Sequence, residues 1–278
     1  MDVISMIIWK DHYTTIFRSA LYETTSTVIS TDDCVIVVDP NWLPQEIADI
    51  KRYVDIIRKD RPLYLLFTHS DYDHIIGYRA FPDAKVIASG AFGRKPLTEK
   101  KQIIEEIHTF DDEYYISRDY SIEYPKVDIV IDGDGTTVDM GQTKLTFYQA
   151  PGHNNDGLFT VIEPIGLFIS GDYFSDIEFP YIYYSGYEYE KTILKLNEIL
   201  SQFDIQLLVT GHGNPTKDSS EIKKRQQESL HYIYQMREYI SAKNEKGITD
   251  LIKNCRFPRN MKKFHHHNRL LIEKELEN

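Results

Sequence analysis

The sequence predicts an α/β fold, because short apolar runs alternate along the chain with segments of helical periodicity. The chain has 278 residues, 41% of them hydrophobic and 27% charged, which is enough apolar material for a large buried core. No linker rich in Gly, Ser or Pro interrupts the pattern. We therefore expect one domain over residues 1–278.

The first part of the chain contains the clearest strands. Residues 24–29 and 34–38 are rich in β-branched side chains, and the polar turn between them predicts a hairpin. Residues 44–59 carry apolar side chains at helical spacing. Residues 63–67 and 85–88 are further short apolar runs, and we expect them to be the next two strands.

A charged and aromatic stretch at residues 95–124 breaks this alternation and predicts a helical insertion, with its helix over residues 98–108. Further strands are expected at residues 129–131, 143–149, 158–162, 167–169 and 207–209. Residues 191–202 have the periodicity of a long helix. Residues 219–278 are expected to form a C-terminal helical extension.

Charge and composition exclude several classes of protein. The net charge is −11, which argues against nucleic acid or an anionic membrane as the main partner. No apolar run is long enough to cross a membrane, and residues 1–5 lack the pattern that opens a secretory signal. Cys34 and Cys255 are the only cysteines, so a disulfide framework and a thiolate metal site are not expected. We expect a cytoplasmic protein.

Four polar segments carry a spaced set of histidines and aspartates, and each follows an apolar run. They are His69-Ser70-Asp71-Tyr72-Asp73-His74, Pro151-Gly152-His153-Asn154, Ser170-Gly171-Asp172 and Thr210-Gly211-His212-Gly213. Because strand ends meet at one edge of a sheet, these loops can converge on a single site.

The residue types at these positions suit two divalent ions. Imidazole nitrogens and carboxylate oxygens bind zinc, iron, manganese or cobalt, and no thiolate is offered. Two ions that lie close together need a bridging anion, which Asp172 could supply. A water molecule held by the pair becomes hydroxide near neutral pH. The alternative interpretation of the first segment is a polar loop in which Asp71 or Asp73 caps a helix.

These segments resemble the metallo-β-lactamase superfamily, whose signature is HxHxDH followed by separate His, Asp and His ligands at later strand ends. The resemblance extends from Val38 to His212 and implies a four-layer αββα sandwich with the metals at one edge. It implies His69, Asp71 and His153 as ligands of one ion and Asp73, His74 and His212 as ligands of the other. It also implies that Asp172 bridges the ions and that Asp73 is catalytic, handling the proton of the attacking water.

One position departs from the signature, since Asp71 stands where the family usually has its second histidine. A carboxylate there is similar to the HxExDH motif of the flavodiiron proteins in the same superfamily. Asp71 makes the site more negative and favours harder ions. We therefore expect two divalent ions, with zinc as the first choice and iron or manganese as alternatives.

The expected function is a metal-dependent hydrolase, in which a metal-bound hydroxide attacks an ester-like bond of a small molecule. Lactones, thioesters, amides and phosphoesters all contain a bond that such a hydroxide could attack. One alternative is a di-iron oxidoreductase acting on oxygen or nitric oxide, although the chain has no Gly-rich phosphate loop for a flavin. The other is a non-catalytic metal-binding sensor module.

Three further residues are candidate substrate contacts. Tyr173 adjoins Asp172, and a phenol there could donate to a developing oxyanion. His265 and Asn268 are one helical turn apart in the C-terminal extension and could reach the site from that helix. For each of them a packing role is the alternative. The exposed aromatic residues, finally, favour a homodimer.

Overall fold

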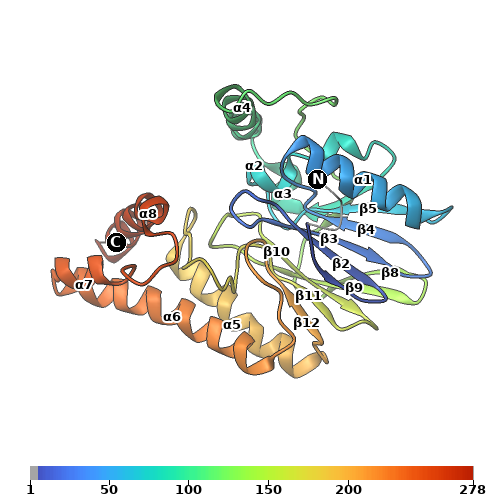
Figure 1. The fold of residues 1–278 in the computed structure, drawn as a ribbon. Helices are drawn as coiled ribbons and strands as arrows, with labels where there is room; N and C mark the ends of the chain where they lie inside the picture. Colours follow the sequence, from blue (N-terminus) through green and yellow to red (C-terminus); the bar gives the residue numbers. More distant parts are fainter. Residues whose placement is uncertain (1–5, 278) are drawn as a thin grey trace.

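The computed structural model describes residues 6–277, which form two β-sheets packed face to face (Figure 1). The first sheet has seven strands in sequence order. They are β1 (Ile7–Lys10), β2 (Thr14–Arg18), β3 (Thr25–Ser30), β4 (Val35–Val38), β5 (Leu63–Leu66), β6 (Lys85–Ser89) and β7 (Ile129–Ile131). Neighbours from β1 to β4 are antiparallel, and those from β4 to β7 are parallel.

The second sheet has five strands in the order β12-β11-β10-β9-β8. They are β8 (Thr136–Met140), β9 (Thr143–Gln149), β10 (Leu158–Glu163), β11 (Leu167–Ile169) and β12 (Leu207–Val209). Only β11 and β12 are parallel neighbours, so β9, β11 and β12 all point the same way. Their carboxyl ends therefore lie at one edge of the sheet.

Helices cover the outer faces of both sheets (Figure 1). Beside the first sheet lie α1 (Pro44–Arg58), α2 (Tyr72–Ile75), the 3-10 turn η2 (Tyr78–Ala80), α3 (Gly90–Arg94) and α4 (Leu97–Glu113). Beside the second lie α5 (Gly186–Gln202) and α6 (Ser219–Ser241), and α7 (Glu245–Asp250) and α8 (Pro258–Glu277) pack against these two helices.

Side-chain alternation in β4 shows how the layers are held together. Val35 and Val37 pack with Ile47 and Ile50 of α1, whereas Ile36 lies in the core between the sheets. Successive side chains of a strand point to opposite faces, so a strand that is apolar throughout must be covered on both sides. The expected αββα sandwich is confirmed.

The elements differ from the predicted ones in several respects, and α4, for example, ends at Glu113 rather than at residue 108. Helix α5 begins at Gly186, five residues before the predicted start at 191, because the Ser185 side chain accepts a hydrogen bond from the Glu188 amide and caps it. Strands β1, β2 and β8 were not predicted. They are short, and β8 alternates between partly buried and exposed residues rather than forming an apolar run.

The described helices include none with both the length and the apolar character needed to cross a membrane. Residues 1–5, on which the expectation about a secretory signal depends, lie outside the described part of the chain.

Candidate metal centre

The loops that carry the histidines and aspartates meet at one edge of the sandwich. His69 lies just beyond the end of β5, and His153, Asp172 and His212 lie beyond the ends of β9, β11 and β12. Backbone hydrogen bonds join the two sheets at this edge, from Leu158 to Thr68 at 2.8 Å and from Thr25 to Gly211 at 2.7 Å. The predicted convergence of the four loops is present in the structure.

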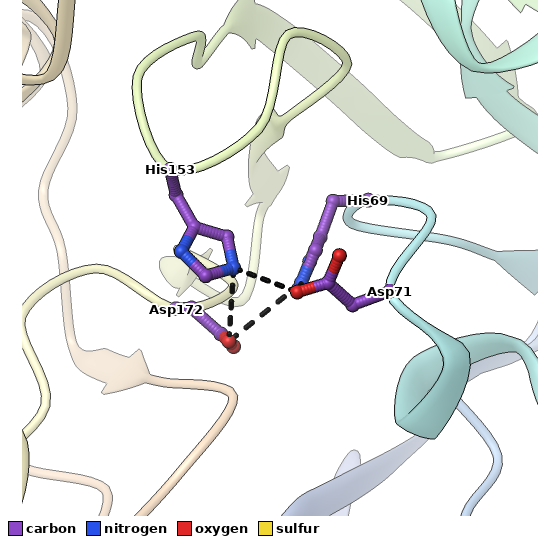
Figure 2. Close-up of side chains that lie close together, drawn as sticks. All are labelled: His69, Asp71, His153 and Asp172. Atoms are coloured by element: carbon purple, nitrogen blue, oxygen red, sulfur yellow. Dashed lines mark hydrogen bonds and ion pairs between the residues drawn. The ribbon is translucent and has the colours of Figure 1, made fainter. Parts of the chain in front are cut away.

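The first group of side chains that could hold a metal ion is His69, Asp71, His153 and Asp172 (Figure 2). The His153 Nε2 atom lies 3.1 Å from Asp71 Oδ2 and 3.4 Å from Asp172 Oδ2. His69 Nε2 lies 3.6 Å from the same two oxygens. All four donor atoms thus point at one small volume.

The second group consists of Asp73, His74 and His212. Asp172 connects it to the first group, since its Oδ1 lies 3.2 Å from His74 Nε2 while its Oδ2 lies 3.4 Å from His212 Nε2. Asp73 Oδ2 lies 3.6 Å from the Nε2 atoms of both histidines. A single carboxylate between two clusters is the arrangement that a bridging ligand requires.

Two of the histidines are oriented by side chains behind the site. His74 Nδ1 lies 3.0 Å from Asp39 Oδ2, and His69 Nδ1 lies 3.0 Å from Thr68 Oγ1, which itself donates to Asp39. Asp39 also accepts from the Thr68 backbone amide at 2.9 Å. One buried carboxylate therefore helps to fix both rings, as outer-shell carboxylates do for metal-binding histidines.

The other two histidines are oriented by backbone carbonyls. His153 Nδ1 donates to the backbone carbonyl oxygen of Tyr181 at 2.7 Å. His212 Nδ1 donates to the backbone carbonyl oxygen of Tyr22 at 2.9 Å. Because a carbonyl can only accept, both rings must carry a proton on Nδ1. The Nε2 atom of each neutral ring then presents a lone pair to the centre.

Several inward-facing atoms lack a hydrogen bond. His69 Nε2, His74 Nε2 and Asp172 Oδ1 are buried and make none with the described part of the chain. Unsatisfied buried polar atoms are costly and need an explanation. Three such atoms at one centre, all of metal-binding types, fit divalent ions as their partners.

The pKa values of the buried histidines and aspartates also favour a bound cation at this centre. Burial opposes protonation of His153, but the hydrogen bond and charge of Asp71, together with the charge of Asp172, outweigh it and raise its pKa to about 9. Burial likewise opposes ionisation of Asp172, yet the nearby His74, His212 and His69 hold its pKa well below the usual range. The carboxylates of the pocket therefore favour positive charge at this centre, which a divalent ion could supply in place of protons.

Glycines allow the ligand loops to approach closely. A Cβ atom on Gly211 would lie 2.1 Å from Asp172 Oδ1, and one on Gly152, which has φ of 132°, would lie 2.3 Å from the Tyr189 Cα atom. Any larger residue would displace the Asp172 carboxylate or the loop that carries His153.

The three candidate substrate contacts have other partners in the structure. The Tyr173 hydroxyl lies 3.0 Å from the Pro151 oxygen, to which it donates, and accepts from the His153 amide at 2.9 Å. Tyr173, 3% exposed, thus orients a ligand loop rather than lining an open pocket.

His265 and Asn268 form a buried network with Tyr232 and the segment before Tyr183. His265 Nδ1 lies 2.9 Å from the Tyr232 hydroxyl, and His265 Nε2 donates to the Ile248 oxygen. Asn268 accepts from the Ile182 amide and donates to the Pro180 oxygen. These contacts occupy the polar groups of His265 and Asn268. They favour a role in attaching α8 to the rest of the domain over contact with substrate.

Two side chains outside the predicted ligand set, Tyr183 and Glu178, lie close enough to interact with ligand histidines. The Tyr183 ring lies 5.0 Å from the His153 ring and is 38% exposed. A cavity of about 930 Å³ between residues 175–180 and helices α6 and α7 has Glu178 in its wall. Burial raises the pKa of Glu178 to about 7, while His212 opposes the rise. No spacing rule identifies these residues, because their loop has no regular structure.

The fold and the paired His/Asp groups define a metallohydrolase-type scaffold, and the sequence agrees. Residues 21–212 match the family described as the metallo-beta-lactamase superfamily, so the chain belongs to that superfamily. Its members are mostly metal-dependent hydrolases. No curated protein matches the sequence.

Solved structures with the same fold are distant in sequence. A metallo-beta-lactamase family protein from Thermus thermophilus is 13% identical with a TM-score of 0.67, over 95% of this chain and 92% of that one. A stereoselective inverting sec-alkylsulfatase from Pseudomonas sp. is 11% identical with a TM-score of 0.68, over 95% of this chain and 49% of that one. A metallo-beta-lactamase from Elizabethkingia meningoseptica is 16% identical with a TM-score of 0.57, over 81% and 90%. At these identities the likeness establishes the fold alone.

Proposed function

We propose that this chain is a binuclear metal-dependent hydrolase that cleaves an ester-like bond, such as a lactone, thioester, amide or phosphoester, in a small molecule. The observation that carries the proposal is Asp172, which lies between the two groups. Its Oδ2 lies 3.4 Å from the Nε2 atoms of both His153 and His212, and its Oδ1 lies 3.2 Å from His74 Nε2. The net charge of −11 supports a small molecule over a nucleic acid as substrate.

The chain supplies the ligands for each ion and a group that handles the proton. His69, Asp71 and His153 would hold one ion, Asp73, His74 and His212 the other, and Asp172 both. Two divalent ions, with zinc first and iron or manganese next, would polarise the oxygen of the scissile bond and lower the pKa of a water molecule. The Asp73 carboxylate would accept the proton of that water.

The test begins with the metal content of the protein, as moles of each element per chain, followed by a panel of lactone, thioester, amide and phosphodiester substrates. About two ions of zinc or manganese and turnover of at least one substrate are expected. Fewer than about half an ion per chain, with none taken up from added metal, would overturn the binuclear centre. Two bound ions without turnover would favour a sensor module.

A di-iron oxidoreductase acting on oxygen or nitric oxide is the second candidate, and Asp71 is the observation that favours it. A carboxylate beside His69 and His153 suits iron better than a third histidine would. Two irons per chain, with consumption of oxygen or nitric oxide in the presence of an electron donor, would support this alternative over the hydrolase.

A further inference from the structure

The two oxygens of Asp71 have different surroundings. Oδ2 faces the centre, 3.1 Å from His153 Nε2 and 3.6 Å from His69 Nε2. Oδ1 faces away and accepts a hydrogen bond from the side-chain amide of Asn154. The carboxylate is therefore held with only one oxygen directed at the other ligands (Figure 2).

The structure also excludes the simplest alternative role for Asp71. It is the residue that precedes helix α2, a position at which an aspartate often caps the first turn. Its side chain makes no capping hydrogen bond to this helix. The conformation of the carboxylate is thus determined by Asn154 and the ligand histidines rather than by the helix.

Asn154 is itself well placed to act as a fixed donor. Its backbone carbonyl oxygen accepts from the Gly152 amide at 2.8 Å, which closes a tight turn around His153. The His153 amide in turn donates to the buried Tyr173 hydroxyl. The turn that presents one ligand, His153, therefore also presents the amide that orients another, Asp71.

We infer that Asn154 is a positioning residue that makes Asp71 a single-oxygen ligand and thereby sets the affinity and the metal preference of the first group. The inference rests on the proposed metal centre. A free carboxylate can bind an ion through one or both oxygens, or rotate away from it. With Oδ1 engaged by the amide, Asp71 offers one donor atom, as the histidine usual at this position would.

The consequence for metal preference follows from coordination geometry. Zinc favours four ligands in a tetrahedron, whereas manganese accepts more oxygen ligands. Releasing Oδ1 would allow Asp71 to bind through both oxygens. Loss of the amide should therefore weaken zinc binding more than manganese binding.

The test measures zinc and manganese affinity by competition with a chelator in wild type and Asn154→Ala. Loss of an outer-shell partner should lower zinc affinity at the first group by about 10–100-fold. Asn155→Ala is the matched control, because Asn155 is the exposed neighbour whose side chain contacts Lys95 instead. Zinc affinity of the control should stay within about twofold of wild type. Asn154→Leu removes the donor, keeps a similar shape and adds no charge beside Asp71, and serves if the alanine variant fails to fold.

A double-mutant cycle separates positioning of Asp71 from a general effect on the loop. In an Asp71→Ala background, Asn154→Ala should cause no further loss of zinc affinity. An equal loss in both backgrounds, or an unchanged zinc-to-manganese preference in the single variant, would overturn the inference while leaving the metal centre intact. Failure of the wild-type protein to bind any ion would instead overturn the proposed function and this inference together.

Discussion

At the scale of single residues, the centre depends on atoms that face away from it. Each ligand histidine has its Nδ1 atom engaged by the protein, by Asp39, Thr68, Tyr181 or Tyr22. These contacts select the tautomer and the ring orientation before an ion arrives. Such pre-orientation would reduce the entropy lost when the proposed ions bind, so these outer contacts would contribute to metal affinity without touching an ion.

Asp73 is the residue whose substitution should affect turnover most. Asp73→Asn keeps the shape but removes the proton acceptor, and weakens one ligand of the second group. We expect kcat for the best substrate of the panel to fall by about 10²–10⁴-fold. Asp83→Asn, an exposed aspartate in a turn, is the control and should retain wild-type kcat. A decrease below about fivefold for Asp73→Asn would show that another group handles the proton.

The residue scale is also where the sequence is most informative. The four residues His69, Asp71, Asp73 and His74 predict a ligand set only in combination with the later His153, Asp172 and His212. The structure brings these seven residues together in two neighbouring groups. For Tyr173, His265 and Asn268 the packing alternatives are the better interpretation, because their partners are remote in sequence.

At the scale of elements, helix α8 supports the ligand loop rather than the substrate. Asn268 binds the backbone of Pro180 and Ile182, on either side of Tyr181, whose carbonyl orients His153. The Tyr181 ring stacks on Phe264 of α8 at 4.1 Å. Helix α8 therefore contacts the segment whose Tyr181 carbonyl orients His153 in the first group.

Asn268→Leu tests this connection. It removes buried hydrogen bonds and leaves the Ile182 amide without its partner, so we expect the free energy of unfolding to fall by about 1–3 kcal/mol. Metal affinity should also decrease, because the Tyr181 carbonyl loses support. Urea denaturation and a zinc titration measure the two effects. The control, His266→Ala, alters an exposed residue of the same helix and should change stability by less than about 0.5 kcal/mol.

At the scale of the whole molecule, the centre joins the two halves of the sandwich. Ligands come from the loop after β5 in one sheet and from loops after β9, β11 and β12 in the other. An ion bound to both sets would stabilise the packing of the sheets, since binding to the folded state alone adds to stability.

The protonation of the buried histidines predicts how metal-free protein responds to pH. Burial opposes protonation of both His153 and His212, yet Asp71 and Asp172 raise the pKa of His153 to about 9, and Glu178 and Asp172 raise that of His212 to about 10. A pKa raised on folding contributes stability below the unfolded value near 6.5, and this contribution is lost as pH rises through the folded pKa values. The melting temperature of chelator-treated protein should therefore fall between about pH 7 and pH 10.

Metal-loaded protein provides the comparison for that measurement. Its histidines bind ions instead of protons, so its melting temperature should fall less over the same range. If the metal-free and metal-loaded curves run parallel across this range, the histidines do not carry the protons assigned to them.

The α/β class, most of the strands and the four segments that carry the candidate ligands could be predicted from the sequence, because periodicity and short motifs are local properties of the chain. Which atoms face each other depends on the tertiary structure. It revealed that Asn154 holds Asp71 and that Asn268 supports the loop that orients His153. Asn154 and Asp71 are 83 positions apart, and Asn268 and Ile182 are 86 apart. Such pairings arise from the packing of the sheets and helices, which no local pattern encodes.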